Sequence, residues 1–445
     1  MDGGAPGPEA GRTSGGTAGG TGGSTAGNTA AGAAGTTGRG AGFNLALATW
    51  TFAINFWAWN LVGPLSAAYA RDLRLSPFQT SMLVAIPVLV GSVGRIPVGA
   101  LTDRYGGRLM FAAVSFLSIL PVLYVAFFGS SYGSMLFGGF VLGIAGTAFA
   151  IGIPFCNAWY DRSRRGFATG VFGAGMGGTA LSAFFTPRLA DGIGRVPAHL
   201  VIAAALAATG VLVLLAARDA PGWRPSSDPV LPRLRDALRI RTTWSTSLLY
   251  ALAFGGFVAF STYLPTYLKN VYDFDAIDAG MRAAGFSLAA VVARPLGGVL
   301  SDRIGPRTVL MVSFGLAAVM ALVVSLEPAP ELGAGLSFVL LAFALGLGTG
   351  GVFALIGQQV PQEKVGSVTG LVGAAGGLGG YFPPLLMGAV YGASGSYFVG
   401  LLLLACAALA ALLFTALAFR PRPAGRTRAP DAGDRRASSD GARRR

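Results

Sequence analysis

The chain is a succession of apolar runs of about twenty residues, the length that an α-helix needs to cross the hydrocarbon core of a bilayer. A helix satisfies its own backbone hydrogen bonds in lipid, whereas a membrane β-strand shows alternating polar residues that these runs lack. We therefore predict an all-α membrane protein. Charged residues, prolines and glycines divide the runs into twelve predicted transmembrane spans, at 43–70, 78–102, 109–128, 133–159, 167–187, 197–217, 244–268, 279–300, 308–326, 333–357, 365–391 and 395–419.

A charged segment, 218–243, separates the sixth span from the seventh. We expect it to be a linker between two six-helix halves, 43–217 and 244–419. Glycine, alanine, threonine and serine dominate residues 1–42, and residues 420–445 are strongly basic, so both tails are expected to be disordered. The polar start does not resemble a secretory signal, which has a basic start, a short apolar core and a cleavage site.

The positive charge is unevenly distributed along the chain. The formal net charge is +14, and most of the 33 lysines and arginines lie in the two tails and in alternate loops, including the linker. This bias is typical of cytoplasmic loops. It predicts a multi-pass protein of the cytoplasmic (inner) membrane with both termini in the cytoplasm, a partner of the lipid bilayer and not of nucleic acid. We expect a monomer.

The two halves share an internal repeat. The segment from Gly94 matches the segment from Ala293 without a gap, at an offset of 199 residues, and glycine-rich segments at 166–178 and 366–380 match at an offset of 200. The second and fifth spans therefore correspond to the eighth and eleventh. The charged members of the first match are Arg95, Asp103, Arg104 and Arg108 in one half and Arg294, Asp302, Arg303 and Arg307 in the other.

Two arginines lie deep inside predicted spans without an acidic partner in the sequence nearby. Each costs roughly 2.5–3.5 kcal/mol at the centre of a bilayer. Arg95 precedes the end of its span by about eight residues, or about 12 Å of helix, too far for its side chain to reach water fully. Arg95 and Arg294 should therefore face one central cavity and bind an anion. The planar guanidinium fork suits planar oxyanions. A monovalent anion neutralises only one of the two positive charges. We therefore expect the carrier to change conformation mainly when it is loaded, which is exchange.

These motifs resemble those of the major facilitator superfamily and, within it, of the nitrate/nitrite porter family, over about 43–419. The resemblance rests on the Gly-x-x-x-Asp-Arg-x-Gly-type loops after the second and eighth spans, the two arginines, and the glycine-rich fifth and eleventh spans. It implies a site at the membrane midplane between two rocking halves. It also implies nitrate and nitrite as substrates, carried by antiport.

The family's binding residues can be placed on this sequence. Two rings sandwich the flat anion, and a tyrosine and a further phenylalanine complete the wall. One position departs from the family, because Met176 stands where an asparagine usually helps to bind the anion. The implied binding residues are Arg95, Arg294, Tyr250, Phe149, Phe254, Phe353, Gly173, Met176, Gly373 and Gly376, and the implied gating charges are Asp103, Arg104, Asp302 and Arg303.

Several alternatives stay open on the sequence. They are proton-coupled nitrate uptake, transport of another small anion such as a short carboxylate, efflux of organic compounds and a non-transporting anion sensor. No aspartate, glutamate or histidine lies mid-span, which argues against proton symport. We expect neither an enzyme nor a cofactor or metal site, because Cys156 and Cys406 lie within apolar spans and the single His199 lies at the edge of the sixth.

Overall fold

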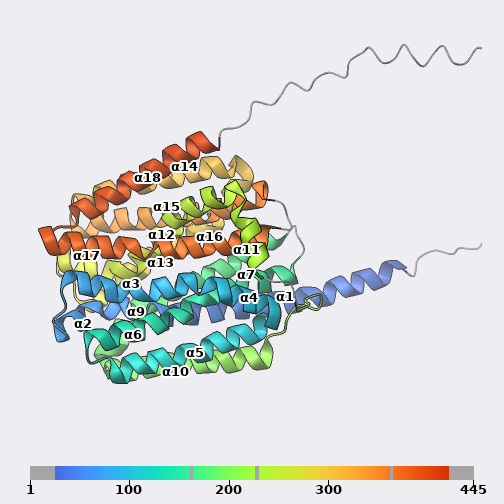
Figure 1. The fold of residues 1–445 in the computed structure, drawn as a ribbon, viewed down its shortest axis with the longest axis horizontal. Coiled ribbons are helices and arrows are strands. Elements are labelled where there is room, and N and C mark those ends of the chain that lie inside the picture. The colour runs from blue at the N-terminus through green and yellow to red at the C-terminus, as the bar shows by residue number, and fades with distance from the viewer. Residues whose placement is uncertain (1–25, 161–163, 226–229, 361–363, 420–445) are drawn as a thin grey trace, which may run out of the picture.

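The structure, a computed structural model, describes residues 26–160, 164–225, 230–360 and 364–419. Long helices run side by side along one direction (Figure 1), and no strand occurs among these residues. The described chain begins and ends at the right-hand end of the bundle in Figure 1. We call this the terminal end and the opposite one the far end. The predicted all-α fold is confirmed.

The first half contains several interrupted spans. Helices α3 and α4 are bent by 40° where they meet at Gly94. Two further spans contain short 3₁₀ segments, η2 and η4, between α-helices. The elements of this half are α1 (Ala26–Trp59), η1 (Gly63–Leu65), α2 (Ser66–Asp72), α3 (Pro77–Val93), α4 (Arg95–Tyr105), α5 (Gly107–Phe128), α6 (Tyr132–Leu142), η2 (Gly143–Thr147), α7 (Ala148–Trp159), α8 (Arg165–Gly173), η4 (Ala174–Gly177), α9 (Gly178–Ile193) and α10 (Arg195–Ala216).

The corresponding positions of the second half lie within unbroken helices. Its elements are α11 (Val230–Leu238), α12 (Arg241–Tyr272), α13 (Ala276–Ile304), α14 (Pro306–Ser325), the π-helical η5 (Pro330–Ala334), α15 (Gly335–Gln359), α16 (Val365–Gly379), α17 (Phe382–Ser394) and α18 (Phe398–Ala418). Within the described ranges, nine helical stretches are long and apolar enough to cross a membrane, and α3 with α4 makes a tenth. The predicted fifth and eleventh spans are not among these ten, because the structure divides the fifth into α8, η4 and α9 and the eleventh into α16 and α17.

Two segments differ from the expected boundaries. Helix α1 begins at Ala26, so residues 26–42 are helical and not disordered as predicted. Alanine favours helix and no proline separates this segment from the first span, so the helix extends backwards. The linker 218–243 is also partly ordered, since α11 forms inside it and α12 begins at Arg241. Residues 1–25 and the tail 420–445 lie outside the described residues.

The sequence repeat is visible in the backbone. Gly106 and Gly305, which join the second span to the third and the eighth to the ninth, both have a φ of +86°. Side chains with a Cβ rarely adopt that conformation. The two matching arginines, Arg108 and Arg307, each donate a hydrogen bond to a backbone carbonyl near the C-terminal end of α10 and α18, respectively. The halves are therefore structural copies at these turns.

Side-chain contacts join the two halves at the far end. The Ser66 hydroxyl of α2 lies 2.7 Å from that of Thr266 in α12. One turn away on α12, the Tyr263 hydroxyl accepts a hydrogen bond of 3.1 Å from Ser81 of α3. All four side chains are buried. The two halves are thus closed against each other at the far end.

Candidate anion site

The two arginines meet the opposite half of the protein. Arg95 is the first residue of α4, directly after the bend, and Arg294 lies in α13; their exposed fractions are 3% and 5%. Arg95 Nη1 donates to the carbonyl oxygen of Gly373 at 2.6 Å. Arg294 Nη1 lies 3.4 Å from Met176 Sδ. Arg95 Nε and Nη2 have no partner, so buried donors remain available for a ligand.

The ring of Phe149 makes cation–π contacts with both arginines. The guanidinium carbon of Arg95 lies 4.7 Å from the ring centroid of Phe149, and that of Arg294 lies 5.7 Å from the same ring. Arg95 is also 5.4 Å from the Phe254 ring, and Arg294 is 5.5 Å from the Phe353 ring. A desolvated contact of this kind contributes about 2 kcal/mol. The rings therefore offset part of the cost of two buried cations in the absence of an anion.

Tyr250 completes the aromatic wall. Its ring stacks on Phe254, with centroids 5.1 Å apart, and meets Phe353 edge-on at 4.9 Å. The hydroxyl interacts electrostatically with both arginines but has no hydrogen-bond partner of acceptable geometry. Gly376 makes room for this ring, since a Cβ there would lie 2.2 Å from Tyr250 Cδ1. The hydroxyl is thus a second buried group able to bond a ligand.

Two further glycines let the side chains of the site approach the backbone. A Cβ on Gly173 would lie 2.9 Å from Arg294 Nε, and one on Gly373 would lie 3.2 Å from Phe149 Cε1. Each glycine belongs to the half opposite the arginine that it contacts. The structure therefore brings all the predicted binding residues together in one cluster, which we call the arginine site.

A cavity leads from the terminal end to this site. Its volume is about 470 Å³, and its walls come from α4, α7, α11 and α16. Arg95 and Phe149 lie among its lining residues, together with Asp103, Asp236 and Lys364. The part contributed by α11 was missed in the sequence, because the charged linker gave no indication that it folds back against α16.

The predicted gating charges lie at the C-terminal ends of α4 and α13, at the terminal end of the bundle. Asp103 lines the cavity, and the guanidinium of Arg104 lies 5.6 Å from the Tyr105 ring. Asp302 and Arg303 are exposed to solvent. Asp103 therefore lies in the cavity wall, whereas Asp302 and Arg303 are not among the lining residues.

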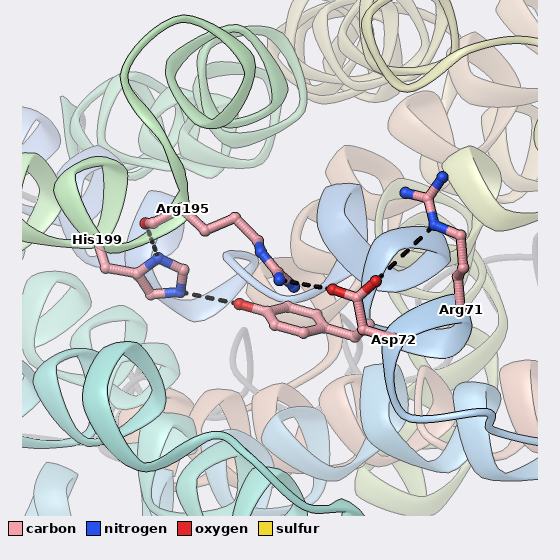
Figure 2. Close-up of polar contacts among 5 residues, drawn as sticks. Arg71, Asp72, Arg195 and His199 are labelled. Carbon is pink, nitrogen blue, oxygen red and sulfur yellow. Dashed lines mark hydrogen bonds and ion pairs between the residues drawn. The ribbon is translucent and has the colours of Figure 1, made fainter.

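His199 has a structural role away from the arginine site (Figure 2). Its Nδ1 lies 2.7 Å from the Arg195 carbonyl oxygen and must donate to it. Nε2 then accepts from the Tyr69 hydroxyl at 3.2 Å. An ion pair of 2.5 Å between Arg195 and Asp72 lies beside them. The cluster ties α2 to α10 near the far end, and among the described residues no group of side chains suits a metal ion.

Two six-span halves around a buried cationic cluster, reached by a cavity from one end and closed at the other, define a membrane transporter. The Major Facilitator Superfamily model matches residues 48–284 and 275–443. The chain belongs to this superfamily and, within it, to the nitrate/nitrite porter family.

The relatives that establish this family are bacterial. A probable nitrate/nitrite transporter of Mycobacterium tuberculosis is 57% identical over 382 residues, 85% of this chain and 97% of its own. A nitrite extrusion protein of Bacillus subtilis is 34% identical over 83% of this chain and 92% of its own. A probable nitrate/nitrite antiporter of Thermus thermophilus is 35% identical over 77% and 83%.

The fold is also similar to that of solved transporters. A bacterial homologue of the human lysosomal transporter Spinster, in an inward-facing and unoccupied conformation, superposes with a TM-score of 0.65. The match covers 84% of this chain and 95% of that one, at 18% sequence identity. It supports the fold.

The thioether of Met176 leads to a first prediction. Sulfur is a weak acceptor for Arg294, whereas an asparagine amide would accept from the guanidinium and could donate to the anion. Met176→Asn should lower the KM for nitrate about fivefold, the value of one added hydrogen bond of about 1 kcal/mol. Initial rates of labelled nitrate entry measure this change. Met176→Leu, which removes the sulfur but keeps the bulk, is the control. Equal KM values in Met176→Asn and wild type would show that this position does not contact the anion.

Proposed function

We propose that the protein carries nitrate and nitrite across the cytoplasmic membrane by exchange, through alternating access to the arginine site. The observation that carries this proposal is the pair Arg95 and Arg294, buried around one phenylalanine ring. In the described part of the chain neither guanidinium forms an ion pair. Two buried cations without a carboxylate partner require an anion.

The surroundings favour a small planar oxyanion. The rings of Phe149 and Phe254 lie 5.9 Å apart at 27°, so the walls beside the guanidinium groups are flat and apolar. Such walls exclude water and strengthen the hydrogen bonds of a bound anion. Nitrate and nitrite are planar, and their in-plane oxygens suit the donors of Arg95 and the hydroxyl of Tyr250. Formate shares these properties and is the competitor to test.

The shape of the molecule supports alternating access. With both termini in the cytoplasm, the cavity faces the cytoplasm and the closed far end faces the outside. In the other state, the gating charges Asp103, Arg104, Asp302 and Arg303 would approach one another as the terminal end closes. The arginine site lies between these two gates, where a rocking movement exposes it alternately.

The cavity offers little for a proton relay. Asp103 and Asp236 are its acidic lining residues, and Asp103 lies about 12 Å along α4 from Arg95 toward the terminal end. In the ranges that the structure describes, the other lining residues include no aspartate, glutamate or histidine. A proton arriving at these carboxylates would have no side chain to carry it on to the arginines. This arrangement favours exchange of one anion for another.

Counterflow in proteoliposomes tests the proposal. Vesicles loaded with nitrite should take up labelled nitrate at least about tenfold faster than empty vesicles, because returning the empty site would move two unneutralised guanidinium groups. Exchange of one negative charge for another is electroneutral. Neither an imposed pH gradient nor a voltage should therefore alter the final distribution of nitrate.

Three results would redirect the proposal. Nitrate accumulation driven by an inward proton gradient, without internal nitrite, would identify a symporter. Faster exchange with formate than with nitrite would make a short carboxylate the substrate. Nitrate binding without any counterflow by the full-length protein would favour a non-transporting anion sensor, whereas intact counterflow after removal of residues 420–445 would exclude it.

A further inference from the structure

Ser287 carries a buried hydroxyl that the arginine site does not use. It lies in α13, is fully buried, and its Oγ has no hydrogen-bond partner. A buried hydroxyl without a partner is costly and uncommon in native proteins. By contrast, the equally buried Ser313 of α14 donates to the Ala344 carbonyl at 2.7 Å. Ser287 therefore requires an explanation that packing within the second half does not provide.

The position of Ser287 on its helix places it at the boundary between the halves. Gly280, Ser287 and Arg294 are seven residues apart and so share one face of α13. At one end of this face, Arg294 contacts Met176 of η4. At the other, a Cβ on Gly280 would lie 2.2 Å from the carbonyl oxygen of Ala183 in α9. The hydroxyl of Ser287 lies between these contacts, on the face of α13 that the first half covers.

This boundary is the part of the molecule that must separate when the far end opens. Helix α13 runs from the far end toward the terminal end, so Ser287 lies about 10 Å beyond Arg294 in the direction of the far end. An anion that left the arginine site in that direction would pass along this boundary, beside α9 and α13. The hydroxyl would be the next hydrogen-bond donor along this face.

We propose that Ser287 is a positioning residue of the transport path, which hydrogen-bonds the anion between the arginine site and the far end. The inference rests on the proposed function. Its hydroxyl would gain its partner when the halves separate at the far end and lose it when they close. The missing bond in the closed state and the new one in the open state both lower the barrier to opening with an anion present.

Kinetics provide the first test. Ser287→Ala should slow nitrate/nitrite exchange about tenfold, the effect of losing one hydrogen bond of about 1.4 kcal/mol on the path. The nitrate-dependent rise in Tm should stay as in wild type, because the arginine site is intact. Ser287→Thr keeps the hydroxyl and should keep most of the rate, which separates a lost donor from a folding defect. Ser313→Ala is the control and should exchange normally.

Thiol labelling provides a second test that needs no transport assay. In a chain with Cys156→Ala and Cys406→Ala, Ser287→Cys should react with a membrane-impermeant thiol reagent added on the side opposite the termini. Ser313→Cys should not react. Nitrate should increase the labelling rate, because it promotes the open state.

The outcomes separate the two proposals. Absence of labelling at position 287 in a protein that exchanges anions would overturn the path, as would an unchanged exchange rate in Ser287→Ala. Labelling at position 287 without any nitrate/nitrite exchange by the wild type would support the path and refute the substrate instead.

Discussion

Replacing Arg95 by lysine should abolish nitrate uptake, and replacing Arg294 by lysine should do the same, although each variant keeps its positive charge. Lysine is a compact point charge without the planar fork. It cannot donate to the Gly373 carbonyl, face the Phe149 ring and present two parallel donors to an oxyanion at once. We expect exchange to fall about a hundredfold or more, because bidentate charge-assisted hydrogen bonds are lost in a dry site. Labelled nitrate counterflow measures the loss.

A third arginine provides the matched control. Arg188 of α9 donates to the Phe184 carbonyl and lies 3.8 Å from the ring of that residue, so it also combines a backbone bond with a ring contact. Arg188→Lys should insert and exchange normally. Tm values in detergent distinguish lost binding from lost folding. Wild-type exchange by both Arg95→Lys and Arg294→Lys would exclude the arginine pair as the anion site.

A disulfide engineered between positions 66 and 266 should stop exchange reversibly. The two hydroxyl oxygens are 2.7 Å apart across the halves, close enough for cysteines at the two positions to approach disulfide geometry. In a chain without Cys156 and Cys406, oxidation of Ser66→Cys with Thr266→Cys would hold the far end closed. Counterflow should fall below about a tenth of the rate of the cysteine-free protein, because each exchange cycle must open both ends. Reduction should restore it.

The single variants Ser66→Cys and Thr266→Cys control for loss of the hydroxyl pair itself. Under oxidising conditions each alone should exchange at nearly the rate of the cysteine-free protein. A fully crosslinked protein that still exchanged at that rate would show that the far end does not open during transport.

The repetitive features of the fold could be predicted from the sequence. Apolar runs predict the spans, and the matching segments around Arg95 and Arg294 predict that the halves are copies. The burial of the two arginines follows from their positions in the middle of predicted spans. The cluster of Phe149, Tyr250 and Phe353 depended on family resemblance, because a chain with 29 phenylalanines gives no independent reason to select two of them.

What could not be predicted depends on how helices rotate and pack against one another. The sharing of the Phe149 ring by both cations follows from the angle between spans of different halves. The sequence also could not predict that the hydroxyl of Ser287 lacks a partner, because a serine in a span usually donates a hydrogen bond to its own helix, as Ser301 does. The fold of α11 against α16 joins segments with no pattern in common.

The interruptions in the first half give the two copies different mechanical properties. Arg95, Phe149 and Met176 each lie at a bend or a 3₁₀ segment, whereas Arg294 lies within the continuous α13. Interrupted helices deform at lower energy than continuous ones, because fewer hydrogen bonds span the break. Pro295 removes one backbone hydrogen bond directly after Arg294, but α13 stays a single helix there, so the first-half support is the more compliant of the two. If both arginines bind the anion, the first-half copy would adjust more readily to the size of the ion, so two ions that differ by one oxygen atom could share the same carrier.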